Sequence, residues 1–170
     1  MDVAGLLAEA YGRVDEEIEG AIHGLTAEQL ATPPEPGANT IGWLVWHLTR
    51  VEDSHIAELI DGAEQLWSSG RWAATFGLEP DPRNSGYGHT PDDVLGVRPS
   101  GTDALLDYYR AVRESTSAYL STLTPADLDE IVDRRWDPPV RLGVRLVSIV
   151  DDEVQHAGQA AYARGLLDRR

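Results

Sequence analysis

The chain has 170 residues, 42% of them hydrophobic, which predicts a single globular domain over residues 1–170 with a substantial core. It has no cysteine, and its 14 positive residues are all arginine, which excludes thiolate metal ligands, a cysteine nucleophile and a Schiff-base lysine. The net charge of −15 argues against a nucleic acid or an anionic membrane as partner. Without a membrane span or a signal peptide in the sequence, we expect a cytoplasmic protein.

The first half of the chain predicts two long helices separated by a short one. Apolar residues at steps of three and four predict an amphipathic helix over 2–24. Thr26, with Gln29 three residues later, has the form of a capping box and predicts a short helix. Helical spacing returns from about Asn39 to Ile60.

The second half predicts two more long helices after an irregular stretch. Residues 63–99 lack a clear period, although Thr90 followed by Pro91 indicates one short helix start. Long helices are predicted from about Thr102 to Leu123 and from about Leu142 to Leu167. The fold class is therefore an all-α four-helix bundle with a long crossover between the second and third long helices. No convincing strand is predicted.

Three side chains form the candidate metal site. On the fourth long helix Asp152 and His156 are four residues apart and point the same way. His47 lies on a largely apolar face of the second long helix. A histidine in that setting is more often a core residue than a ligand, and acid–histidine pairs also occur on solvated helix faces. Together, however, the three make the donor set with which bundles hold a divalent ion such as zinc, nickel, iron or manganese.

The fourth long helix also carries an aliphatic stripe that includes Val147, Val150 and Val154. This stripe lies nearly opposite the side of Asp152 and His156. Periodicity alone would therefore place the aliphatic side in the core and the Asp152 side in solvent. Either the helix is buried on two sides, or the stripe contacts a partner subunit, and we expect a homodimer.

Two segments of the chain resemble the DinB-like superfamily, which includes mycothiol-dependent maleylpyruvate isomerase and bacillithiol transferases. They are NTIGWLVWHL, residues 39–48, and DEVQHAGQAAYARG, residues 152–165. The resemblance implies a four-helix bundle with a three-residue metal site. Its first and last ligands match His47 and His156, and its middle ligand falls on Asp152. Many members have histidine at that position, and the isomerase-like members have glutamate. Because the aspartate of this chain departs from both, Glu153 is the alternative carboxylate ligand.

The resemblance also implies a function. A divalent ion would activate an external thiol of the mycothiol type as co-substrate, for S-transfer to an electrophile or for thiol-assisted isomerisation. The alternatives are a non-catalytic metal-binding or stress-related protein, and a helical dimer with a vestigial site. Of the other histidines, we expect His23 to be a cap or surface residue and His55 to pack in the core, while His89 could reach the site from a loop.

Overall fold

The computed structural model describes residues 2–69 and 71–169, and it confirms the all-α prediction. Its four long helices are α1 (Val3–Ile22), α3 (Ile41–Leu59), α5 (Thr102–Leu120) and α6 (Leu142–Leu167). The short helical elements are α2 (Ala27–Leu30), η1 (Leu66–Ser69), η2 (Ala73–Phe76), α4 (Pro91–Gly96) and η3 (Asp127–Asp129). The strands are β1 (Ile131–Asp133) and β2 (Val140–Arg141).

Side-chain caps set where several helices begin. The Asp2 carboxylate accepts a hydrogen bond from the Gly5 amide at the start of α1, and the Thr40 hydroxyl accepts one from Trp43 at the start of α3. Thr26 and Gln29 form the predicted capping box of α2. The short helix predicted after Thr90 is also present, as α4, with a capping box of its own.

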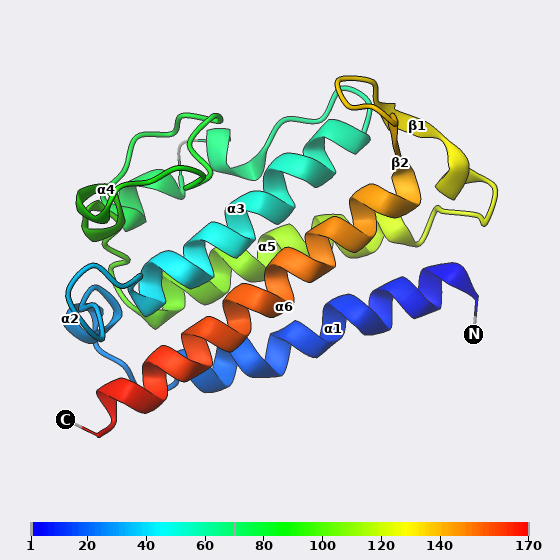
Figure 1. Ribbon diagram of the computed structural model, residues 1–170. Helices are drawn as coiled ribbons and strands as arrows, with labels where there is room; N and C mark the ends of the chain where they lie inside the picture. The colour runs from blue at the N-terminus through cyan, green and yellow to red at the C-terminus, as the bar shows by residue number, and fades with distance from the viewer. Residues whose placement is uncertain (1, 70, 170) are drawn as a thin grey trace.

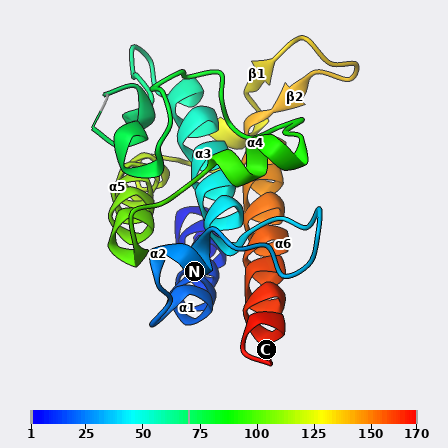
Figure 2. The same ribbon diagram turned by 90° about the vertical axis from the view of Figure 1, so that its left-hand side faces the viewer.

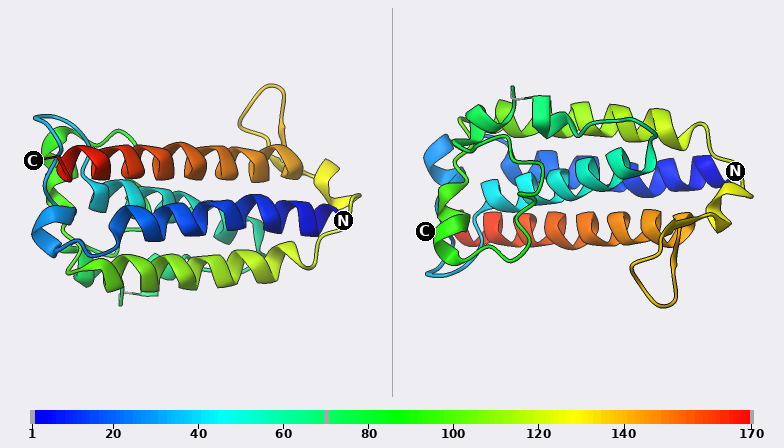
Figure 3. Two further views of the ribbon diagram at one scale, coloured as in Figure 1. Left: turned by 90° about the horizontal axis from the view of Figure 1, so that it is seen from below. Right: turned by 90° about the horizontal axis from the view of Figure 1, so that it is seen from above.

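The four long helices pack side by side as a bundle (Figure 1). Both α1 and α3 contact α5 and α6, and the views from below and above show the same arrangement (Figure 3). In Figure 1, α1 and α6 run in one direction while α3 and α5 run in the other. Because α3 and α5 are parallel, the chain must return along the whole bundle between them. The segment 60–101 makes this crossover along the α3 side of the bundle, and α4 lies near the end of the bundle where α3 begins (Figure 1 and Figure 2).

The crossover is attached to the core by aromatic side chains. Trp67 from η1 and Phe76 from η2 are both fully buried and lie against Tyr108 of α5, with ring centroids 5.5 and 6.0 Å away. Trp46 of α3 packs edge-on against Trp67 at 5.8 Å. These four buried rings therefore hold the crossover in one position against α3 and α5.

The absence of strands was predicted wrongly. β1 and β2 form an antiparallel pair in which Ile131 lies opposite Arg141. Strands of three and two residues are too short to produce an alternating pattern in the sequence. Asp133 at the end of β1 accepts a hydrogen bond from Arg135 within the hairpin and another from Arg145 of α6, and the second attaches the hairpin to the bundle.

The burial of α6 also differs from the periodicity prediction. Val147 and Val154 are 63% and 45% exposed, whereas Ile149 and Arg145, on the side of Asp152, are buried. The reason is the packing of α6 against α3 and α1, which buries the side that carries ionisable groups. Among the described helices none is long and apolar enough to cross a membrane.

Candidate metal centre

The α3 histidine is fixed by contacts on two sides. His47 is only 6% exposed, and its ring stacks on Trp43 at a centroid distance of 4.6 Å. Its Nδ1 lies 2.5 Å from the backbone carbonyl of Ser85 in the crossover. A carbonyl can only accept, so Nδ1 carries the proton and donates, which leaves the lone pair of Nε2 available to a ligand.

Asp152 and His156 of α6 have their side chains next to each other on one face of the helix. Asp152 Oδ1 lies 3.6 Å from Nε2 of His156, one helical turn further on. On the other side of the ring, Nδ1 of His156 lies 3.1 Å from Oε1 of Gln159. An amide oxygen accepts, so Gln159 favours a proton on Nδ1 and directs Nε2 towards Asp152.

These elements bring the three predicted residues together. One ligand atom from each of His47, Asp152 and His156 lies within 4.8 Å of the others, and the two imidazole ring centroids are 4.8 Å apart. Oδ2 of Asp152 is buried and, within residues 2–69 and 71–169, has no hydrogen-bond partner. Two imidazole nitrogens and a carboxylate with one unpaired buried oxygen are a donor set suited to a divalent transition metal ion.

The two histidines differ in electrostatic environment. Burial lowers the pKa of His47, an effect that its hydrogen bond to Ser85 and the charge of Asp152 only partly offset. For His156 the hydrogen bond and charge of Asp152 outweigh burial, so its pKa is raised. The environment of His47 therefore favours the neutral imidazole that can coordinate an ion, whereas protonation competes more strongly with an ion at His156.

Glu153, the alternative carboxylate ligand, points elsewhere. It is fully buried, and neither of its oxygens has a hydrogen-bond donor in the described part of the chain. Burial, followed by the charge of Glu52 on α3, raises the pKa of Glu153 well above its usual range. The cluster of candidate ligand atoms contains Asp152 and not Glu153.

The remaining histidines lie outside this cluster. His89 reaches towards the site from the crossover, but its Nδ1 accepts from Trp43 Nε1 at 3.0 Å and its Nε2 lies 2.9 Å from Oδ1 of Asn84. The expectation that His55 packs in the core is wrong, because its side chain is 38% exposed. Its Nδ1 lies 2.7 Å from Nη1 of Arg145. His23 is the exposed C-cap of α1, as predicted.

A small cleft adjoins the site along α6. It has a volume of about 160 Å³ and lies between the segment before α3 and the second half of α6. Its polar lining comes from Glu35, Asn39, Gln159 and Tyr162, above an apolar floor that includes Leu44. Gln159 thus both lines the cleft and contacts His156.

Sequence reasoning missed the backbone contribution of the crossover. Ser85 contacts His47 through its carbonyl, a group that every residue carries, so no side-chain pattern indicates it. The neighbouring Gly86 does leave a signal. It has φ +94°, and a Cβ at this position would lie 2.7 Å from Nδ1 of His47. A glycine there is required for the close approach of the loop.

The fold and site define a helical-bundle protein with a candidate histidine–aspartate metal centre. The family model described as mycothiol-S-transferase matches residues 6–169, and the chain belongs to this family. Among solved structures it is similar to a conserved protein from Enterococcus faecalis, with 34% identity, a TM-score of 0.90 and coverage of 100% of this chain and 99% of that one. No curated protein matches the chain.

Proposed function

We propose that His47, Asp152 and His156 bind one divalent transition metal ion, at which an external thiol of the mycothiol type is activated so that its sulfur attacks an electrophile. The observation that carries the proposal is the convergence of three ligand atoms beside the unpaired buried Oδ2 of Asp152. The printed description of the family supplies the class of thiol. Because the chain has no cysteine, the sulfur must come from a small molecule.

A divalent ion supplies one property, which is to lower the pKa of a thiol that coordinates it. The protein supplies the geometry. Ser85 and Gln159 orient the two imidazoles, and three protein ligands leave a position for the thiol. The thiol proton leaves to solvent, and the sulfur lone pair forms the new C–S bond. In a substitution, the leaving group departs with the electron pair of the bond that breaks.

The adjoining cleft is suited to the remainder of the thiol. Its amides, phenol and carboxylate can bind hydroxyl groups, and Tyr162 is 71% exposed and available for contact. Glu35 disfavours an anionic group there. A neutral polyhydroxylated thiol therefore fits the cleft better than a carboxylate-bearing one such as glutathione.

Metal content tests the first half of the proposal. We expect about one equivalent of a transition metal in the wild type by mass spectrometry, and its loss in His47→Ala and in His156→Ala. His23→Ala is the matched control, because that histidine is exposed and lies outside the candidate cluster. A wild type that holds no metal even after reloading would overturn the proposal.

A thiol-transfer assay tests the second half. The metal-loaded protein should accelerate the reaction of mycothiol with a simple electrophile, and the acceleration should be lost in His156→Ala. Tight metal binding with neither thiol binding nor acceleration would instead favour the non-catalytic metal-binding alternative. Calorimetry with mycothiol and with glutathione compares the two thiols at the same site.

A further inference from the structure

One buried arginine joins the metal-binding helix to the crossover. Arg50 lies on α3, three residues after His47, and its side chain is fully buried. All five of its N–H donors have acceptors. These are the carbonyls of Pro82 and Asn84 at 3.1 Å, Gln65 Oε1 at 2.7 Å, Asp53 Oδ2 at 3.1 Å and the Tyr108 hydroxyl at 3.2 Å.

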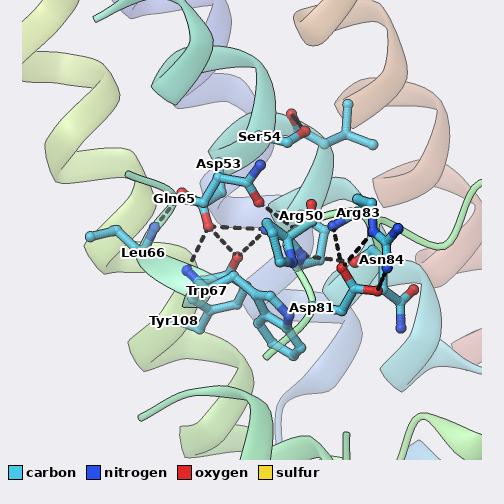
Figure 4. Close-up of polar contacts among 12 residues, drawn as sticks. Arg50, Asp53, Ser54, Gln65, Leu66, Trp67, Asp81, Arg83, Asn84 and Tyr108 are labelled. Atoms are coloured by element: carbon cyan, nitrogen blue, oxygen red, sulfur yellow. Dashed lines mark hydrogen bonds and ion pairs between the residues drawn. The ribbon is translucent and has the colours of Figure 1, made fainter. Parts of the chain in front are cut away.

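Asp53 completes this cluster from the next turn of α3. Its carboxylate pairs with Arg50 and accepts hydrogen bonds from the backbone amides of Leu66 and Trp67, each at 2.9 Å. It also accepts one from the hydroxyl of Tyr108 at 2.7 Å. Figure 4 shows the arginine between the carboxylate on one side and the residues around Asn84 on the other. The buried charge is thus neutralised and fully hydrogen-bonded.

The two carbonyls that Arg50 holds lie one and three residues before the carbonyl that orients His47. Asn84 accepts from Arg50 Nε, and the next residue, Ser85, accepts from Nδ1 of His47. The Asn84 side chain further contacts His89 at 2.9 Å, and His89 accepts from Trp43. Arg50 therefore fixes the backbone at the point where it meets the candidate ligand.

Little space separates the crossover backbone at Gly86 from the imidazole of His47. A Cβ on Gly86 would lie 2.7 Å from His47 Nδ1 and 2.9 Å from the Trp46 ring, so backbone and imidazole are in close contact. Released from Arg50, the carbonyl of Ser85 has other positions available, and His47 loses the acceptor that selects its Nδ1–H tautomer. The ring would then present Nε2 to the metal position for only part of the time.

We propose that Arg50 is a positioning residue for the metal centre: by binding the Pro82 and Asn84 carbonyls it keeps the Ser85 carbonyl against His47, and so sets the orientation and tautomer of that ligand. This inference rests on the proposed metal site. Outer-shell partners of metal-bound histidines typically contribute 10- to 100-fold in affinity, and we assign Arg50 an effect of that size, about 10-fold or more.

Arg50→Lys is the most informative variant. Lysine keeps a positive charge beside Asp53, but its single nitrogen cannot bind both carbonyls in the geometry of a guanidinium. We expect a dissociation constant for Co²⁺ or Zn²⁺ raised by about 10-fold or more, measured by competition with a chelator. Tyr108→Phe is the matched control, because it removes a hydroxyl from the same buried cluster without touching the crossover carbonyls. It should lower the melting temperature and leave the affinity within about twofold of wild type.

A second measurement does not depend on metal. ¹⁵N NMR of the metal-free protein should show His47 as the Nδ1–H tautomer in the wild type and in Tyr108→Phe, and as a tautomer mixture in Arg50→Lys. Should Arg50→Lys fail to fold, Gly86→Ala separates the same carbonyl from His47 by steric overlap and should give the same tautomer mixture and affinity loss.

The possible outcomes separate the two proposals. Wild-type affinity and tautomer in Arg50→Lys, or an equal affinity loss in Tyr108→Phe, would show that Arg50 contributes only to stability and would overturn the inference. A wild type without metal affinity would overturn the proposed function instead, and the tautomer measurement would still decide the role of Arg50.

Discussion

Asp152 and Glu153 are adjacent on α6, yet their carboxylates lie in opposite chemical environments. Asp152 is partly exposed, faces two imidazoles and has one oxygen unpaired beside them. Glu153 is fully buried and faces Glu52, with Arg113 of α5 as the nearby cation. A turn of about 100° along the helix thus separates a position that a cation can enter from one where burial and a second carboxylate raise the pKa of a carboxyl group. Two neighbouring acids in a sequence give no indication of this difference.

The largest expected effect is on metal affinity, which should depend on the residues around Asp152 and not on Glu153. His156→Ala removes a proposed ligand and should weaken transition-metal affinity by more than about 100-fold, above the range typical of outer-shell changes. Glu153→Gln should leave the affinity within a few-fold of wild type, because this side chain lies outside the cluster. Isothermal titration of both variants provides the comparison. Equal losses in the two would mean that Glu153 also contributes a ligand to the metal.

Metal loading should stabilise the fold through Asp152 and its two histidines. With the free ion at about 100 times its dissociation constant, the free energy of unfolding should rise by about 2.7 kcal/mol. Denaturant titrations with and without a chelator measure this difference. His47→Ala should abolish it, and a gain of the same size in that variant would indicate that the ion binds elsewhere.

Glu153→Gln should stabilise the metal-free protein at neutral pH. The folded-state pKa of Glu153 is raised, so folding takes up a proton above the ordinary carboxyl pKa of about 4.3 and stability falls as the pH rises from there. Glutamine mimics the neutral form towards Glu52, and we expect a gain of about 1–3 kcal/mol at pH 7.

The pH dependence is the specific test of that explanation. The gain from Glu153→Gln should shrink as the pH falls and approach zero below the unfolded-state pKa of about 4.3, where the carboxyl becomes protonated in both the folded and the unfolded state. The charged groups facing it are Glu52 on α3, Arg113 on α5 and Asp152 on α6. Urea titrations at three pH values measure the trend, and a difference that stays constant with pH would show that packing and not charge is responsible.

The smallest expected effect on stability comes from changes to the exposed valine stripe of α6, on the side opposite Asp152. Val147 and Val154 remain exposed, and we expect this stripe to pair with a second copy of the chain. Replacing both valines by serine should convert a dimer into a monomer in sedimentation, with the stability of the subunit changed by less than about 0.5 kcal/mol. Leu6→Ser is the control, since Leu6 is 60% exposed on a different helix. A monomeric wild type at high concentration would contradict the expectation.

Much of the architecture was accessible from the sequence because local signals were strong. Spacing and caps placed the four long helices within a few residues, and α6 at its observed ends. The pairing of Asp152 with His156 follows from one helical turn, whereas their meeting with His47 depends on how α3 packs against α6, which local spacing does not determine. The burial of α6 was predicted wrongly because the side with charged groups is covered by α3, and charged residues are expected outside. Backbone acceptors such as Ser85, and the crossover that carries them, depend on tertiary structure alone.

The pairing of α1 with α6 has a consequence for how the chain folds as it is synthesised. Tyr11 of α1 bonds the Leu146 carbonyl, and Arg164 of α6 bonds the carbonyl of His23, so contacts join segments more than a hundred residues apart. Such non-local contacts slow folding and leave apolar surface uncovered in the nascent chain. The last long helix, α6, completes the bundle and carries two of the three proposed ligands. A ribosome-bound chain that ends before Leu142 should therefore remain protease-sensitive and unable to bind the metal ion.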